Sequence, residues 1–591
     1  MIFLPAAIRN SGWLFYFTTY IFVAIKSSNS IIFLFKNYNM LHFFVRYSFI
    51  MVIGILVACN DDKTSVDDQD GLSAFSADSL GKHIAELSSD AFMGRKPFSE
   101  GETKTIKYLE EQFAAVGLEP GNGDSYFQEV PMVKISTKAV DAMQVQSAKG
   151  NFTLKGFDDY VIWTDKTDSA ISFYNDELVF AGYGVVAPEY DWNDYEGLDV
   201  KGKIVLVLVN DPGFNAHDST LFKGKTMTYY GRWTYKFEEA AKQGAKGCLI
   251  VHNTEAAAYP FTVVQNNWNG SRLRLDNRGK QETLCDVIGW VSGPTAKKLL
   301  EAAGTDTTLL AKADQEGFKG QSLGLKLSTT MQVSTEYNKS YNVIGKITGS
   351  KHPDETIVYT AHWDHLGIGK AYDNDSIYNG ALDNASATSG LLELARGFKS
   401  LKTKPERTIV FLSVTAEEQG LWGSAYYAQN PVYPINKTVA NINMDGLNWF
   451  GKTKDIVVVG KGQNDLEDYL KEAAEKTNRE IAFELHPEAG SYYRSDHFNF
   501  AKVGVPALYT SSGTDIEGKG KDYGKQLKEN YTAKNYHRPS DEYDPQIWKL
   551  DGAIADLQLL FRVGRRLAFE NKWPGWKDNS EFKAIRERSL Q

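Results

Sequence analysis

The sequence predicts an α/β fold in which helices flank a mixed, largely parallel sheet. From residue 341 to about residue 570, apolar runs that suit buried strands alternate with helical segments. Residues 356–360 and 408–414 are two such runs, and a predicted helix over residues 387–400 lies between them. Alternation of this kind is typical of layered α/β domains, whose ligands gather beyond the carboxyl ends of the strands.

A second, β-rich unit is predicted between residues 136 and 330. Strand-type runs occupy residues 178–186 and 203–209, and a predicted helix near residues 234–243 ends at Gly244. This unit interrupts the α/β domain, which begins before it and resumes after it. The predicted divisions are a signal region (1–58), a tether (59–75), a first α/β segment (76–135), the β-rich unit (136–330), the main α/β segment (331–575) and a C-terminal tail (576–591).

The composition is that of an ordinary globular protein with more than one domain. Its 591 residues exceed the roughly 250 to 300 at which a single hydrophobic core stops growing. The formal charge of -9 is modest for this length, so no nucleic-acid partner is predicted. Only three cysteines occur, which excludes a cysteine-based metal cluster. Any metal site must therefore consist of His, Asp and Glu side chains.

The N-terminal region contains two apolar stretches, at residues 11–25 and 49–58. Neither reaches the about 18 apolar residues of a membrane span. The second stretch has the form of a secretory signal, and Leu-Val-Ala-Cys at residues 56–59 resembles a bacterial lipobox. We therefore expect cleavage before Cys59, a lipid on that cysteine and an extracytoplasmic location at the bacterial cell envelope.

The start of this signal has two interpretations. A lipoprotein signal of this length starts near Met40, so residues 1–39 are interpreted as an artefact of start-site choice. A membrane helix in residues 11–25 is the alternative.

Polar side chains follow the carboxyl ends of two predicted strands, so they would lie at the same edge of the predicted sheet. His362 and Asp364 come directly after residues 356–360, and Glu417 and Glu418 come directly after residues 408–414. Adjacent carboxylates after a buried strand are costly to bury without a partner, and a cation would offset that cost. Taken one at a time, these residues have other interpretations. His362 could be a hydrogen-bonded histidine of the core, and Glu417 and Glu418 could lie in a solvated loop.

Three further residues complete a candidate metal site. Asp383 precedes the predicted helix, where it would otherwise be an N-cap; Asp445 ends a probable strand; and His537 lies in a loop. With His362 and Glu418 they form a set of five imidazole and carboxylate ligands. Such a set suits zinc or a similar transition ion and disfavours an all-oxygen calcium site.

Together these motifs resemble the di-zinc peptidase family of bacterial aminopeptidases and glutamate carboxypeptidase, known as metallopeptidase family twenty-eight. The likeness extends over nearly all of the chain from Ser76 onward. Residues 180–184, 200–204 and 240–247 resemble a protease-associated domain. The resemblance implies a zinc-peptidase fold with an inserted β-rich protease-associated domain.

The resemblance also implies two zinc ions per chain and assigns their ligands. One zinc ion would take His362 and Asp445, and the other would take Glu418 and His537. Asp383 would bridge the two ions.

The same likeness gives roles to three residues that hold no metal. Asp364 would orient His362, Glu417 would be the general base, and Tyr536 would donate a hydrogen bond to the oxyanion of the reaction. The implied activity is that of an aminopeptidase that cuts N-terminal residues from peptides through a metal-bridging hydroxide.

Three other functions remain open at this point. A carboxypeptidase of the same family needs a basic side chain for the substrate carboxylate, and Arg494 could serve. A single-zinc aminoacyl cyclase is disfavoured by the full set of five ligands. A receptor-like binding protein without catalysis is disfavoured because Glu417 and every ligand are present.

Overall fold

The structure is a computed structural model that describes residues 12–17, 20–27, 30–32 and 69–591, except residues 217–219, 266–267, 281 and 579. It divides into two units, residues 1–68 and residues 69–591. In the first unit, β1 (Gly12–Phe17), β2 (Tyr20–Ser27) and β3 (Ser30–Ile32) form an antiparallel sheet. Most of the stretch considered as a membrane helix is therefore in strands.

The predicted lipid site at Cys59 and most of the predicted tether lie outside the described residues. Among the residues that are described, no helix is long and apolar enough to cross a membrane. The lipid anchor therefore stays a prediction from the sequence.

The second unit opens with two helices that cover the central sheet. They are α2 (Ala77–Leu87) and α3 (Glu100–Val116). The hydroxyl oxygens of Ser76 and Ser99 accept hydrogen bonds from backbone amides of the first turns, as N-caps do. Gly117, with a φ of 85°, ends α3 in the left-handed conformation that favours glycine.

The central sheet is mixed and largely parallel, as the sequence predicts. Its strands, in spatial order, are β16 (Gln321–Ile347), β20 (Arg407–Val414), β17 (His352–His362), β21 (Thr438–Met444), β24 (Ala507–Ser512), β22 (Asp455–Val458) and β23 (Glu480–Phe483). The four central strands β20, β17, β21 and β24 run parallel to one another. Their carboxyl ends therefore meet at one edge of the sheet.

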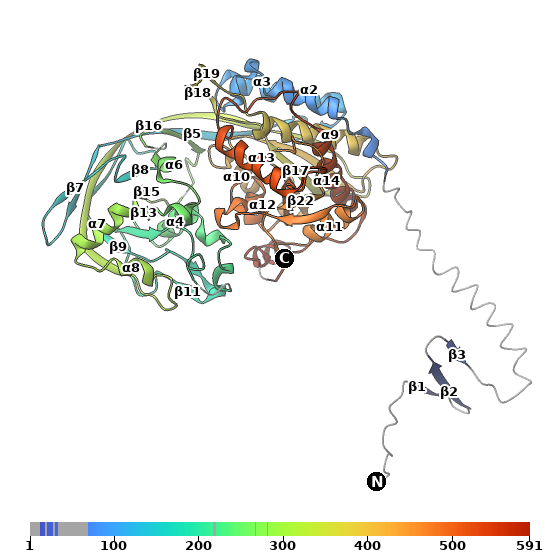
Figure 1. The fold of residues 1–591 in the computed structure, drawn as a ribbon, viewed down its shortest axis with the longest axis horizontal. Helices are drawn as coiled ribbons and strands as arrows, with labels where there is room; N and C mark the ends of the chain where they lie inside the picture. The colour runs from blue at the N-terminus through green and yellow to red at the C-terminus, as the bar shows by residue number, and fades with distance from the viewer. Residues whose placement is uncertain are drawn as a thin grey trace, which may run out of the picture. The chain divides into compact units, whose positions relative to one another are not determined.

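Helices cover both faces of this sheet (Figure 1). One face packs against α2, α3, α9 (Ala387–Lys399), α11 (Leu466–Glu475) and α14 (Asp551–Phe569) in the largest apolar cluster. The other face packs against α10 (Trp422–Gln429) and α12 (His497–Lys502) through Tyr427 and Phe500. The predicted helix at residues 387–400 is thus confirmed, because its apolar side is buried on the sheet.

The β-rich unit is joined to the sheet by two long strands. β5 (Phe127–Ala139) pairs with β16 along nearly its whole length, and both run from one lobe to the other (Figure 1). The predicted division points at residues 135 and 331 fall inside these strands. Paired strands without a flexible linker make a stiffer connection between the lobes than a polar linker would.

The β-rich unit contains its own apolar clusters. Its parallel strands are β9 (Ala170–Phe180), β12 (Ile204–Leu208), β13 (Gly247–Val251) and β15 (Val287–Val291), with α4 (Trp233–Lys242) and α7 (Gly293–Ala303) among its helices. Its other strands are β6 (Ala142–Gln146), β7 (Phe152–Lys155), β8 (Tyr160–Trp163), β10 (Val186–Ala187), β11 (Trp192–Asn193) and β14 (Ser271–Leu275).

One strand prediction in this unit was too long. The run at residues 178–186 is interrupted, because β9 ends at Phe180 and β10 starts at Val186. Gly182 and Gly184 between them have positive φ values of 53° and 65°. Glycine adopts this conformation without strain, so the chain turns where the apolar run predicted a continuous strand.

Candidate active site

Three neighbouring parallel strands deliver most of the candidate residues to one edge of the sheet. His362 is the last residue of β17, Asp445 follows the end of β21, and Glu417 and Glu418 follow the end of β20. Because these strands are adjacent and parallel, side chains just beyond their ends converge.

Asp383 and His537 come from irregular segments above this edge. Asp383 lies in the turn Ala381–Ser386 that leads into α9. His537 follows α13 (Lys521–Lys534) and has a φ of 58°. Asp541 fixes the first of these segments, because its carboxylate accepts hydrogen bonds from the backbone amides of Leu382 and Asp383, both at 3.1 Å.

The Asp383 carboxylate lies between two imidazole rings. Its Oδ1 is 3.3 Å from His362 Nε2, and its Oδ2 is 3.2 Å from His537 Nε2. His362 Nε2 is also 3.3 Å from Asp445 Oδ1, and His537 Nε2 is 3.0 Å from Glu418 Oε2. The five residues thus form two imidazole and carboxylate pairs that share Asp383.

This arrangement fits a pair of zinc ions. His537 Nε2 is shielded from solvent and forms no hydrogen bond within the described part of the chain, although two carboxylates lie within 3.2 Å of it. Several buried carboxylates together are unfavourable unless cations offset their charge. Nitrogen and oxygen donors in this number are those that zinc takes in proteins.

Glu417 faces the same cluster without belonging to either pair. Its Oε2 is 3.9 Å from His362 Nε2. Burial, and then the neighbouring carboxylates of Asp445 and Glu418, raise the pKa of Glu417 well above its usual range. A carboxylate with a raised pKa is suited to accept and return a proton.

Two segments of the chain match known protein families. Residues 342–561, which contain all five residues of the cluster, match Peptidase family M28, and residues 175–281 match the PA domain. Residues 342–561 belong to peptidase family M28. The β-rich unit is an inserted PA domain.

Curated relatives of this M28 protein include proteins named as aminopeptidases and proteins named as carboxypeptidases. It is 28% identical to Aminopeptidase YwaD of Bacillus subtilis (strain 168), over 54% of this chain and 57% of that protein. It is 29% identical to Glutamate carboxypeptidase 2 homolog of Caenorhabditis elegans, over 45% of this chain and 38% of that protein. The chain thus spans less than two thirds of the length of either relative.

Among solved structures, the aminopeptidase from Aneurinibacillus sp. strain AM-1 is similar at 20% identity, with a TM-score of 0.48. The likeness covers 86% of this chain and 97% of that one.

Asp364 contacts the M28 cluster in a way that the sequence did not predict. This cluster consists of His362, Asp383, Glu418, Asp445 and His537. His362 Nδ1 lies 3.1 Å from the backbone carbonyl oxygen of Asp364 and 3.8 Å from its Oδ1. The Asp364 carboxylate instead accepts hydrogen bonds from the backbone amides of Glu417 at 2.9 Å and Glu418 at 3.4 Å. Asp364 therefore links the His362 strand end to the loop that carries both glutamates.

His365 was missed as a site residue. It is fully buried, and its Nδ1 lies 2.6 Å from Glu418 Oε1, while His537 faces Oε2 of the same carboxylate. The signal was present in the sequence, because His362 and His365 leave the same strand three residues apart. Contact with a ligand carboxylate is an outer-shell interaction that fixes the ligand's orientation.

Arg95 was also missed as a site residue, and it connects backbone segments that carry residues of the M28 cluster. Its buried guanidinium donates hydrogen bonds to four backbone carbonyl groups, those of Leu87 (2.7 Å), Trp363 (2.9 Å), Asn379 (2.6 Å) and Gly380 (2.9 Å). Two of these carbonyls belong to the segment before Asp383, and one belongs to the loop after His362. Nothing in the sequence around Arg95 marks this role, since three of its four partners lie more than 250 residues away along the chain.

We expect Arg95→Met to destabilise the protein strongly. The methionine leaves four buried carbonyl groups without their donor, which lowers the free energy of unfolding by about 3 kcal/mol or more. Urea denaturation measures the loss. Arg588→Met, the same substitution at an exposed position, should change stability by less than about 0.5 kcal/mol. Equal effects of the two variants would contradict the role given to Arg95.

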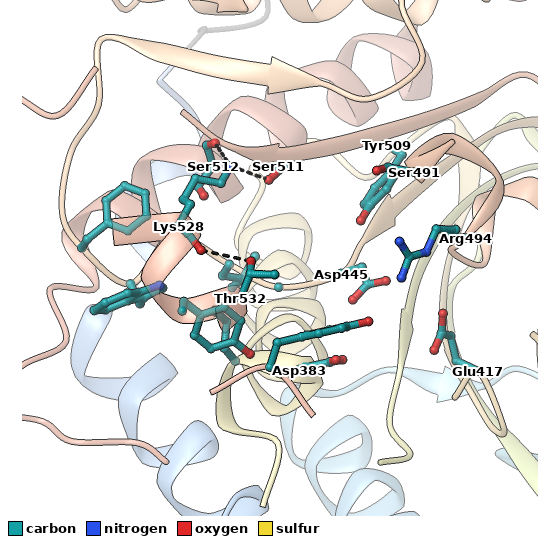
Figure 2. A pocket seen from close by; sticks show the side chains of 17 residues that line it. Asp383, Glu417, Asp445, Ser491, Arg494, Tyr509, Ser511, Ser512, Lys528 and Thr532 are labelled. Carbon is teal, nitrogen blue, oxygen red and sulfur yellow. Dashed lines mark hydrogen bonds between the residues drawn. The ribbon is translucent and has the colours of Figure 1, made fainter. Parts of the chain in front are cut away.

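A pocket of about 370 Å³ opens beside the M28 cluster (Figure 2). Asp383, Glu417 and Asp445 line one part of it, together with Arg494 and Tyr536. The ring of Tyr536 stacks on His537 with centroids 3.9 Å apart. The pocket is large enough to enclose a substrate side chain beside the cluster.

Proposed function

We propose that this protein is a zinc-dependent exopeptidase that removes N-terminal residues from peptides. The observation that carries the proposal is the position of Asp383 between two imidazole and carboxylate pairs, beside an open pocket. The relatives named aminopeptidase support it.

In this proposal the five clustered residues hold two zinc ions. His362 and Asp445 would hold one, Glu418 and His537 would hold the other, and Asp383 would be a ligand of both. When bound, zinc supplies Lewis acidity, which polarises a peptide carbonyl and lowers the pKa of water at the site toward neutrality.

The side chains supply the proton transfers. Glu417 accepts the proton of the attacking water and returns it to the nitrogen of the leaving peptide. Its backbone amide is held by Asp364 at 2.9 Å, which fixes the loop that aims its carboxylate. Tyr536, stacked on His537 and lining the pocket, donates a hydrogen bond to the developing oxyanion.

A carboxypeptidase is the second candidate, and one observation favours it. Arg494 is exposed and lines the same pocket, and its charge is close enough to Glu417 for the two to interact. An arginine in this position could bind the carboxylate of a peptide C-terminus. The two candidates differ in which end of the peptide must be free.

The anchor proposed for the enzyme is the lipid on Cys59, which would hold it at the extracytoplasmic side of the bacterial cell envelope. The support for this part is the lipobox-like sequence at residues 56–59.

Metal removal and a panel of blocked peptides test the activity. We expect about two zinc ions per chain, loss of amino-acid release after chelation, and recovery when zinc is added back. Peptides with a free N-terminus and an amidated C-terminus should be cleaved, and their N-acetylated forms should not. Cleavage of only the N-acetylated peptides with free carboxyl groups would assign the carboxypeptidase activity instead.

The same experiment separates the remaining alternatives. A single-zinc cyclase would contain one zinc ion per chain and release no amino acid from the peptides. A binding protein without catalysis would cleave none of the peptides at any zinc content.

A further inference from the structure

The pocket has a positively charged end that the proposed chemistry does not use. Lys528 of α13 lines it, next to Ser511 and Ser512 at the carboxyl end of β24. Lys528 Nζ donates hydrogen bonds to Ser511 Oγ at 3.1 Å and to the backbone carbonyl of Ser512 at 2.9 Å (Figure 2). An ammonium group has three donors, so these two bonds leave one donor for a ligand.

Part of the pocket wall is apolar. Leu447, Trp449, Phe450 and Tyr531 are among the residues that line the pocket. Such a wall suits the methylene groups of a substrate side chain, because it removes them from water. A polar group at the tip of that side chain would then reach the end of the pocket that contains Lys528.

Lys528 is not neutralised by an ion pair within the described residues. The two nearest acidic groups that influence it are Asp455 and Asp556. The Asp455 carboxylate accepts hydrogen bonds from the backbone amides of Thr514 and Asp515, and Asp556 is paired with Arg479 at 2.5 Å. Burial lowers the pKa of Lys528 to about 8, so the ammonium group is largely charged at neutral pH.

The position of Lys528 relative to Glu417 decides which substrate residue it faces. In Figure 2, Asp383 and Asp445 lie between Lys528 on one side and Glu417 with Arg494 on the other. Glu417 protonates the leaving peptide in the proposed reaction, so the leaving peptide extends toward Glu417. The side chain of the N-terminal residue then extends in the opposite direction, toward Lys528.

We propose that Lys528 selects peptides whose N-terminal residue has an acidic side chain, aspartate or glutamate. The inference rests on the proposed exopeptidase activity and adds its substrate class. The substrate carboxylate accepts a charge-assisted hydrogen bond from Lys528 Nζ while its methylene groups contact the apolar wall. A neutral side chain of the same shape loses the charged interaction.

The test compares substrates that differ only in this charge. With the zinc-loaded full chain, kcat/KM for N-terminal glutamate should exceed that for the isosteric glutamine by about tenfold or more. Lys528→Met should reduce that ratio to about one while leaving kcat/KM for N-terminal leucine within about twofold. Calorimetry gives an independent measurement, in which free glutamate binds the natural protein more tightly than glutamine and loses that advantage in Lys528→Met.

Lys525→Met is the matched control, because Lys525 lies one turn earlier on α13 and is exposed beside Glu529. It should leave the glutamate to glutamine ratio unchanged.

Equal hydrolysis of the two substrates by the natural protein would overturn the inference and leave the exopeptidase activity standing. A parallel loss for glutamate and leucine in Lys528→Met would overturn it as well, since it would assign Lys528 to holding α13 on β24. Absence of hydrolysis of every free-amine peptide would refute the exopeptidase itself, and the inference with it.

Discussion

Glu417→Gln is expected to lower kcat by about 10²- to 10⁴-fold while the zinc content of the protein stays unchanged. Glutamine has the shape of glutamate, but its amide is not basic enough to accept a proton from water at neutral pH. Glu417 is outside both imidazole and carboxylate pairs, with its Oε2 3.9 Å from His362 Nε2, so the substitution removes no proposed ligand. Peptide hydrolysis and elemental analysis of the same sample measure the two quantities together.

Two further glutamate variants make this result specific. Glu418→Gln should lose zinc as well as activity, because Glu418 Oε2 faces His537 Nε2 at 3.0 Å. Glu529→Gln, on the exposed side of α13, should change neither. Undiminished turnover in Glu417→Gln would remove the general base from the mechanism, and zinc loss in that variant would make Glu417 a ligand.

Asp383→Asn is expected to have the second large effect, loss of zinc together with loss of activity. Each carboxylate oxygen of Asp383 faces one imidazole, at 3.3 Å and 3.2 Å, and an amide cannot offer two equivalent anionic oxygens. The decrease in kcat/KM should exceed the roughly 10- to 100-fold typical of residues that only support a ligand. Zinc content after dialysis and hydrolysis at saturating zinc are the measurements.

Asp541→Asn supplies the comparison for this effect. Asp541 holds the backbone of Leu382 and Asp383 but is not a proposed zinc ligand. The decrease in kcat/KM in Asp541→Asn should therefore stay within that 10- to 100-fold range. If Asp383→Asn keeps two zinc ions after dialysis, or if Asp541→Asn has the larger effect, Asp383 does not bridge the two pairs.

The arrangement of the sheet was predictable because its strands are buried on both faces. Residues 356–360 and 408–414 appear as continuous apolar runs for that reason, and the structure places them in β17 and β20. The strand at residues 178–186 was predicted less well. There the apolar character continued through Gly182 and Gly184, while their backbone conformation ended the strand.

The sequence by itself determined which side chains could form the site. His362, Glu418 and Asp445 follow apolar strands, and parallel strands bring such residues to one edge whatever the details of packing. The tertiary structure decided how they pair, with Asp383 between His362 and His537. That pairing depends on Asp541, which holds the irregular segment of Asp383, and on the backbone conformation at His537 in the other segment.

Other roles had no local signal at all. Arg95 binds carbonyl groups of segments more than 250 residues away along the chain, and Lys528 lines a pocket whose other walls come from distant segments. Periodicity and strand ends report on neighbours within one element or one edge of a sheet. Hydrogen bonds and pocket walls between distant segments arise only when the whole chain is folded, and these contacts determine how the site is supported.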